Sequence, residues 1–141
     1  MKKTSKLTFL DKEALDEIDW KEMESLFAAT RRKRPFHQAR RLQRSFANSY
    51  SASFAFLDQK LVGCGRTLSD GQVHGWIHDV MIHPDFQGKG IGKALMQVLI
   101  KQLAGVRYLG LLCSEDDVAF YEKCGLGRWG FTAMGIRQKT R

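Results

Sequence analysis

The spacing of apolar positions changes from helical in the N-terminal third to strand-like in the middle of the chain. Apolar residues at three- and four-residue steps predict helices before and behind Pro35. The two stripes consist of Leu15, Ile18, Met23, Leu26 and Phe27, and of Ala39, Leu42 and Phe46. Next, the strand-like runs 53–57 and 61–66 enclose a short polar turn and predict a hairpin.

A long strand, a glycine-rich loop and a helix follow the hairpin. The segment 73–82 reads as a strand ended by His83 and Pro84. The loop opens a helix that ends near Gly105. The apolar stripe of this helix consists of Ile91, Ala94, Leu95, Val98, Leu99 and Leu103. A further strand over 106–113 and a short helix over 118–123 complete the prediction.

Length and composition restrict the class of protein. With 141 residues, 43% of them hydrophobic and 27% charged, the chain is long enough for one domain with a real core, which we place over residues 1–141. No apolar run approaches the ~20 residues that cross a bilayer, so we expect no membrane span. Three cysteines and no apolar leader predict a reduced, cytoplasmic protein.

The net charge of +8 is concentrated in one basic segment, residues 31–44. This segment contains seven cations and no acid. Such a surface favours anionic partners. One hypothesis is therefore a nucleic-acid-binding or regulatory module that uses Arg31–Arg44, although the segment has no base-reading motif, so we expect no specific nucleic acid. The other interpretation is an exposed basic face that steers an anionic cofactor or an acidic acceptor.

The glycine-rich loop follows a strand and opens a helix, an arrangement that predicts an anion cradle. Free backbone N–H groups at the positive end of the helix dipole attract phosphate, and glycine lets it approach closely. Three residues stand between Gly88 and Gly92-Lys93, and Ala94 follows, so the loop is no P-loop. Leu95 occupies the place where a dinucleotide fingerprint has Gly or Ala. The alternative interpretation, a glycine-rich turn that binds no ligand, is still possible from this loop alone.

Three sequence blocks together carry a family resemblance. They are Asp79-Val80-Met81-Ile82-His83-Pro84, the Gln-x-x-Gly-x-Gly pattern at Gln87, Gly90 and Gly92, and Phe120-Tyr121-Glu122-Lys123-Cys124-Gly125. In this order and spacing they resemble the GNAT superfamily of acyl-CoA-dependent N-acetyltransferases over about residues 53–136. The resemblance implies an α/β (α+β) fold, a mixed, mostly antiparallel twisted sheet with helices on both faces.

Shorter pieces resemble the plastid and cyanobacterial GNATs, which include plant serotonin N-acetyltransferases. These pieces are Arg34-Pro35, Asn48-Ser49-Tyr50, Arg66 and Ser69-Asp70-Gly71. The resemblance implies acetyl transfer from acetyl-CoA to a primary amine by direct attack. The expected acceptor is an arylalkylamine, a polyamine or a protein amine. A homodimer is an open alternative to a monomer.

The same resemblance implies a cofactor site along the long strand and the loop. The pantetheine arm would pair with the backbone of Val80 and Ile82, and the pyrophosphate would lie on residues 88–93. The implied cofactor-binding residues are Val80, Met81, Ile82, Gln87, Gly88, Lys89, Gly90, Ile91, Gly92, Lys93 and Ser114. For Lys89 and Lys93 the alternative is an exposed lysine at a helix start. For Ser114 it is a helix cap, because Ser114-x-x-Asp117 resembles a capping box.

Attack of an amine on a thioester requires deprotonation of the ammonium, stabilisation of an oxyanion and a proton for the thiolate. The family resemblance implies that backbone N–H groups near Val80 and Met81 stabilise the oxyanion. Tyr121 is the candidate acid, because a phenol with a pKa near 10 stays protonated at neutral pH. The alternative for Tyr121 is a buried tyrosine that packs the core.

His78 is the best side chain for the base, because an imidazole titrates near neutrality. Simple alternation along the strand places His78 with Trp76, Val80 and Ile82 on the face where the cofactor would run, and Asp79 on the other face. Animal arylalkylamine acetyltransferases carry His at a similar place, whereas the plant relatives tend to have Trp. A chain of water molecules is the alternative base.

The remaining polar and aromatic residues predict little chemistry. We expect no metal site, because His74 and His78 are on the order of 13 Å apart along a strand. For Cys124, a role as an acyl-accepting nucleophile is the weaker interpretation, and a small buried residue at a helix end is the stronger one. We expect His37, His74 and His83 at the surface. The residues Trp20, Phe36, Tyr50 and Trp129 either line an aromatic acceptor pocket or belong to the core.

Overall fold

The computed structural model describes residues 4–30 and 38–139, which form two units, one up to Leu111 and the other from Leu112. The prediction of a single domain over 1–141 is not tested by this division and stays a prediction. No helix in the described part of the chain has the length and apolar character that a bilayer crossing requires.

A tight hairpin joins β2 (Ser51–Leu57) to β3 (Lys60–Ser69). Asp58 and Gln59 form its turn with φ values of 48° and 73°. Positive φ at both central residues matches the right-handed twist of the strands, and Asp tolerates this region better than most residues do. The predicted hairpin is therefore confirmed, with both strands longer than expected.

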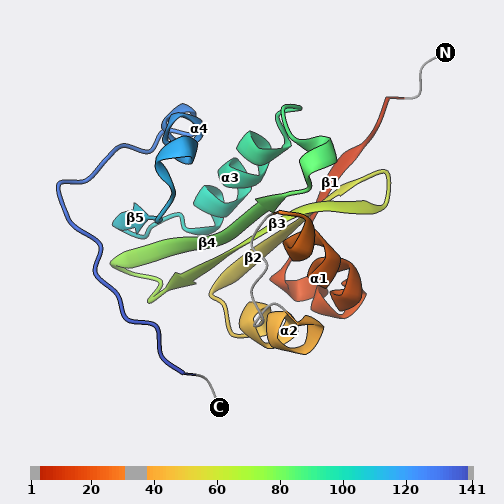
Figure 1. The fold of residues 1–141 in the computed structure, drawn as a ribbon, viewed down its shortest axis with the longest axis horizontal. Coiled ribbons are helices and arrows are strands. Elements are labelled where there is room, and N and C mark those ends of the chain that lie inside the picture. The colour runs from red at the N-terminus through yellow and green to blue at the C-terminus, as the bar shows by residue number, and fades with distance from the viewer. Residues whose placement is uncertain (1–3, 31–37, 140–141) are drawn as a thin grey trace. The chain divides into compact units, whose positions relative to one another are not determined.

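The first unit is built on a five-stranded sheet in the order β1-β2-β3-β4-β5 (Figure 1). The strands β1 (Leu7–Asp11), β2, β3 and β4 (His74–Ile82) pair antiparallel, whereas β4 and β5 (Tyr108–Gly110) pair in parallel. The mixed, mostly antiparallel sheet is thus confirmed. The sequence pattern did not predict β1, and β5 is much shorter than the predicted strand over 106–113.

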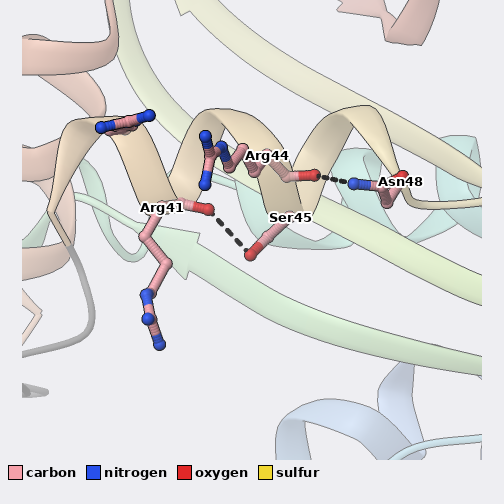
Figure 2. Close-up of a pocket in the computed structure, with 5 residues that line it drawn as sticks. Arg41, Arg44, Ser45 and Asn48 are labelled. Carbon is pink, nitrogen blue, oxygen red and sulfur yellow. Dashed lines mark hydrogen bonds between the residues drawn. The ribbon is translucent and has the colours of Figure 1, made fainter. Parts of the chain in front are cut away.

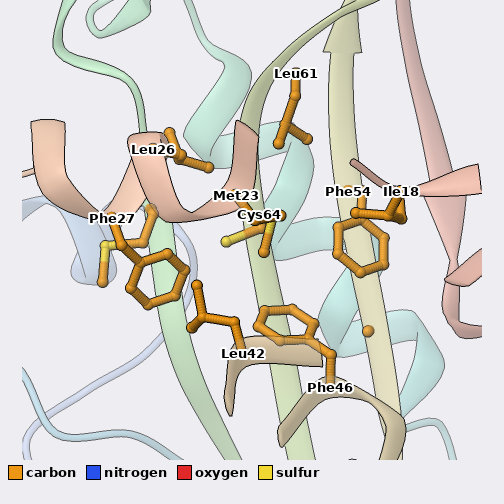
Figure 3. Close-up of a cluster of buried hydrophobic side chains, with 11 residues drawn as sticks. Ile18, Met23, Leu26, Phe27, Leu42, Phe46, Phe54, Leu61 and Cys64 are labelled. Atoms are coloured by element: carbon orange, nitrogen blue, oxygen red, sulfur yellow. The ribbon is translucent and has the colours of Figure 1, made fainter. Parts of the chain in front are cut away.

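Two helices cover one face of the sheet, α1 (Trp20–Ala29) and α2 (Ala39–Ala47) (Figure 1). The short 3-10 turn η1 (Lys12–Glu17) precedes α1, and the Asp19 side chain caps α1 by accepting from the N–H groups of Lys21 and Glu22. The apolar stripes of both helices meet side chains of β2, β3 and β4 in one core cluster (Figure 3). Its buried members are Ile18, Met23, Leu26, Phe27, Leu42, Phe46, Ala52, Phe54, Leu61, Cys64 and Met81.

The opposite face carries α3 (Ile91–Gln102), which follows the turn η2 (Pro84–Phe86). A Cβ at Gly65 would lie 2.5 Å from Cδ1 of Leu99, so glycine is required for α3 to approach β3 this closely. Cys64, the neighbour of Gly65, points into the cluster under α1 and α2. Helices on both faces of the sheet are therefore confirmed.

The second unit contains the 3-10 turn η3 (Glu115–Asp117) and α4 (Val118–Lys123). Gly125, with a φ of 93°, ends α4, and the N–H of Leu126 donates to the carbonyl of Tyr121. Glu115 and Arg128 form an exposed ion pair, with 2.6 Å between Oε2 and Nη2. The predicted short helix is confirmed.

Candidate active site

A β-bulge interrupts β4 at Asp79. Cys64 on β3 lies opposite Met81, but Arg66 lies opposite His78, so one residue of β3 faces two residues of β4. Asp79 has a φ of 54°, in the left-handed region that non-glycine residues rarely adopt. A bulge of this kind bends a strand and redirects its side chains.

The bulge corrects the predicted arrangement of side chains along β4. Cys64 and Arg66 share one face of β3, so their partners Met81 and His78 share the face that α1 and α2 cover. Ile82 packs instead against the cluster that contains Ile91 of α3. His78 and Ile82 therefore lie on opposite faces, and their predicted placement on one face is wrong, because the extra residue shifts the alternation.

Asp79 was expected on the face opposite His78, and this is also wrong. Nε of Arg66 donates to Oδ2 of Asp79 at 2.6 Å, which brings the carboxylate to the side of the sheet where α2 lies. Nη1 of the same guanidinium donates to Oγ of Ser49 at 3.3 Å, and its Cζ lies 5.9 Å from the ring centre of Phe46. A half-buried ion pair thus fixes the bulge to the end of α2.

The strain at Asp79 leads to a stability prediction. Asp79→Ala removes the ion pair and keeps the unfavourable φ, whereas Asp79→Gly removes the ion pair and relieves the φ. We expect both variants to be less stable than the wild type, and Asp79→Gly to be more stable than Asp79→Ala by about 1 kcal/mol. Urea unfolding of both proteins measures the difference. An Ala variant as stable as the Gly variant would show that the bulge carries no strain.

His78 is half-buried beside this ion pair. Burial lowers the pKa of its imidazole below 6.5, the positive charge of Arg66 lowers it further, and Asp79 partly opposes the shift. The imidazole is therefore neutral at pH 7, which is the form that accepts a proton. Its position next to the bulge keeps His78 a candidate base.

The outer edge of β4 is open next to the bulge. The pairing between β4 and β5 ends at Trp76 and Gly110, and no other described strand lies beside this edge. The N–H of His83 donates to the carbonyl of Val62 on β3, so the backbone groups of Ile82 point away from β3. The carbonyl of Ile82 accepts from Nε2 of Gln87, so the N–H of Ile82 is the group left for an extended ligand at this edge. Pairing of the pantetheine arm with Val80 and Ile82 stays a prediction.

The glycine loop, residues 88–93, continues from this edge. Gly88 and Gly90 have φ values of 76° and 81°, and a Cβ at either position would have no atom within 4 Å. Gly90 is the N-cap of α3 and makes no side-chain hydrogen bond to the first turn of the helix. Glycine is needed for the backbone conformation, and the open space lets an anion approach the N–H groups.

The side chains around the loop divide into binding and positioning roles. Gln87 was predicted to bind the cofactor, but its Nε2 donates to the carbonyl of Ile82 at 3.0 Å, which holds the loop to β4. The ammonium groups of Lys89 and Lys60 lie 5.3 and 5.1 Å from the ring centre of Phe86. Lys60 thus adds a second positive charge beside the loop, which the sequence pattern did not indicate because Lys60 belongs to the hairpin.

The second unit contains the remaining predicted site residues, Ser114 and Tyr121. Oγ of Ser114 donates to Oδ2 of Asp117 at 3.0 Å and makes no bond to a helical N–H, so the predicted capping box is wrong in detail. The ring of Tyr121 contacts Phe120, with 5.0 Å between centroids. The roles of Ser114 with the cofactor and of Tyr121 as the acid stay predictions.

Other predicted residues are placed as follows. Trp20 packs edge-on against Phe54, with 6.0 Å between centroids, and belongs to the core. His74 is exposed and stacks on Tyr108 of β5, whereas His83 is half-buried beside Phe86. Within residues 4–30 and 38–139 there is no group of three or more His, Cys, Asp or Glu side chains that could hold a metal ion. His37, Phe36 and the cations at 31–34 lie outside the described residues.

Known proteins share both the sequence and the fold of this chain. Residues 12–126 match the Acetyltransferase (GNAT) family. The chain belongs to the GNAT acetyltransferase family. The uncharacterized N-acetyltransferase ycf52 of Porphyra purpurea is 47% identical over 68 residues, 47% of this chain and 39% of that protein. The chloroplastic GCN5-related N-acetyltransferase 3 of Arabidopsis thaliana is 38% identical over 79 residues, 53% of this chain and 33% of that protein.

These relatives confirm the expected similarity to plastid GNATs, although the matches span less than half of either relative. A GNAT family protein from Streptococcus pneumoniae TIGR4 has the same fold, with a TM-score of 0.79 and 20% identity over 96% of this chain and 100% of that one. The bulged β4, its open edge and the glycine loop are thus parts of a GNAT fold.

Proposed function

We propose that this GNAT protein transfers the acetyl group of acetyl-CoA to a primary amine. The observation that carries the proposal is the open edge of β4, which leads directly into the glycine loop at the start of α3. The edge offers backbone partners to the pantetheine arm, and the loop offers N–H groups and the charges of Lys60, Lys89 and Lys93 to the phosphates. No resident metal enters the proposal.

The reaction proceeds by direct attack. The amine nitrogen attacks the thioester carbonyl, the C–S bond breaks, and the CoA thiolate takes up a proton while the nitrogen loses one. Backbone N–H groups at Val80 and Met81, next to the bulge, stabilise the oxyanion. His78, or a water molecule beside it, takes the proton from the amine, and Tyr121 protonates the thiolate.

The lowered pKa of His78 predicts the pH dependence. A base must be neutral, so kcat/KM with saturating acetyl-CoA should be constant above neutral pH and fall only as the pH drops below 6.5, through the lowered pKa. His78→Asn should remove this acidic limb and lower kcat. Because Arg66 lowers the pKa of His78, Arg66→Met should move the limb toward higher pH. An unchanged profile in His78→Asn would assign the base to water.

The acceptor is a small arylalkylamine, a polyamine or a protein amine. Release of free thiol from acetyl-CoA, followed over a panel of these amines, tests the activity and sorts the three classes. Calorimetric binding of acetyl-CoA to the same preparation tests the cofactor separately. Tight binding of acetyl-CoA without turnover on any amine would contradict amine acetylation but leave the cofactor site in place.

Two further properties complete the proposal. A reduced, cytoplasmic location is part of the proposal and rests on the use of cysteine in the sequence. The homodimer stays a prediction, and sedimentation of the purified chain measures it. The nucleic-acid hypothesis rests on charge alone, and nothing further in the described residues supports it.

A further inference from the structure

The peptide group between Asp79 and Val80 lies within the bulge of β4. Its carbonyl, that of Asp79, accepts a hydrogen bond from Sγ of Cys64 at 3.5 Å. The Cys64 side chain belongs to the core cluster under α1 and α2, so this carbonyl is turned toward that face of the sheet. The peptide is trans, and in a trans peptide the N–H points opposite to the carbonyl. The N–H of Val80 therefore points away from Cys64 and from the cluster.

The thiol of Cys64 stays protonated and so keeps its role as a donor. Burial raises the pKa of this thiol well above its ordinary value, the carboxylate of Asp79 raises it further, and the positive charge of Arg66 opposes the shift in part. A thiol is a weak donor, whereas a thiolate cannot donate at all. The contact with the Asp79 carbonyl is therefore kept throughout the neutral pH range.

The side chain of Asp79 is held by Arg66, which is itself bonded at two nitrogens. Nε of Arg66 donates to Oδ2 of Asp79 at 2.6 Å, and Nη1 donates to Oγ of Ser49 at 3.3 Å. Oγ of Ser49 donates in turn to the carbonyl of Ser45 at 2.7 Å, and Nζ of Lys12 donates to the carbonyl of Ser49 at 2.6 Å. Ser49 is only 2% exposed, so water competes little for these bonds. The planar guanidinium is thereby fixed in one orientation.

The last turn of α2 supports this arrangement from behind. Nδ2 of Asn48 donates to the carbonyl of Arg44 at 2.8 Å and closes the end of the helix, as Figure 2 shows. On the inner side of the helix, Phe46 is fully buried and its ring centre lies 5.9 Å from Cζ of Arg66. A packed helix end thus holds the guanidinium against the bulge.

We propose that Arg66 and Cys64 are positioning residues for acetyl transfer, which hold the peptide after Asp79 so that the N–H of Val80 faces the thioester carbonyl of acetyl-CoA. This inference rests on the proposed acetyl transfer and names the groups that align its oxyanion donor. The φ of 54° at Asp79 is a strained conformation, which persists only while its surroundings hold it. A donor to an oxyanion is effective when its alignment is set before the reaction, so a peptide that relaxes and rotates loses this effect.

Kinetics separate alignment of the donor from binding of the cofactor. Arg66→Met should lower kcat by about 10- to 100-fold and change KM for acetyl-CoA by less than about twofold, because a misaligned donor affects the transition state most. Arg66→Lys should recover part of kcat, since an ammonium can bond Asp79 but lacks the rigid fork that also bonds Ser49. The measurement is made above the acidic limb of both proteins, where His78 is neutral, so that its pKa does not enter.

Arg107→Met is the matched control, because it removes an exposed arginine beside β5 by the same substitution and should leave kcat unchanged. A kcat of Arg66→Met equal to that of the wild type would overturn the proposal. So would an equal loss of kcat in Arg107→Met, since the effect would then come from charge alone.

Infrared spectroscopy tests the alignment without turnover. A hydrogen bond lowers the stretching frequency of a carbonyl, so the band of acetyl-CoA labelled with ¹³C at its thioester carbonyl reports the N–H of Val80. At saturating acetyl-CoA this band should lie higher in Arg66→Met than in the wild type, and higher by a smaller amount in Cys64→Ala. Cys113→Ala, which removes an exposed thiol, should leave it in place.

The infrared result stands apart from the proposed function. If no amine is acetylated, the proposed function fails, while a band that moves in the two variants still supports the alignment. If Arg66→Met does not fold, the band in Cys64→Ala decides, because that substitution leaves the ion pair in place. A band at one frequency in the wild type and in every folded variant overturns the proposal.

Discussion

Replacement of Tyr121 by Phe is expected to lower kcat by about 10²–10⁴-fold while the fold and the affinity for acetyl-CoA are kept. The substitution removes only the hydroxyl group, so the ring contact with Phe120 in α4 remains. Loss of the acid leaves the CoA thiolate without a proton as the C–S bond breaks. Steady-state kinetics at saturating acetyl-CoA measures kcat, and calorimetry measures the affinity.

Two comparisons make the Tyr121 result specific. Tyr108→Phe removes an exposed hydroxyl from β5 and should leave kcat unchanged. With an acyl donor whose thiol is more acidic, the loss in Tyr121→Phe should shrink, because a better leaving group needs less protonation. Full activity of Tyr121→Phe with acetyl-CoA would assign the proton to water or another side chain, and lost CoA binding would make Tyr121 a positioning residue.

The second large effect is expected at Gly90. Gly90→Asp places a carboxylate where the glycine loop meets α3, so the affinity for acetyl-CoA should fall by about 100-fold through repulsion of the pyrophosphate. The space around a Cβ at Gly90 is open, and an acid at a helix start interacts favourably with the dipole. The free energy of unfolding should therefore fall by only about 1–2 kcal/mol, the cost of the positive φ.

Gly90→Asn separates the effect of the added charge from the effect of the added side chain, because Asn has nearly the same size as Asp and tolerates the left-handed region of φ. Calorimetry should show an affinity between those of the wild type and Gly90→Asp. A folded Gly90→Asp protein that binds acetyl-CoA as tightly as the wild type would remove the loop from the cofactor site.

Features fixed by local sequence were predictable. The helix after the glycine loop can be predicted because Ile91, Leu95 and Leu99 repeat at helical spacing. The loop itself can be predicted because Gly88 and Gly90 lie close together just before this helix. The hairpin was found because a polar turn separates two apolar runs. Each of these signals acts within a few residues and needs no distant partner.

Features fixed by distant partners were missed. The strand β1 has only five residues, and its pairing with β2 joins segments more than 40 residues apart. The bulge depends on Arg66, which holds Asp79 in a conformation that alternation does not reveal. An arginine and an aspartate on neighbouring strands of a hairpin are a weak signal for such a pair. Lys60 was missed for the same reason, since only the fold brings it to Phe86.

The parallel contact between β4 and β5 has a consequence for folding. Short connections join β2, β3 and β4 along the chain. The connection from β4 to β5 is longer and contains α3, and β5 forms only three residue pairs with β4. Closing the loop between β4 and β5 costs conformational entropy before the strand pairing contributes any stabilisation. Because only three residue pairs hold β5 to the sheet, we expect this edge to open before the longer antiparallel pairings, and it borders the segment of β4 where the cofactor is proposed to bind.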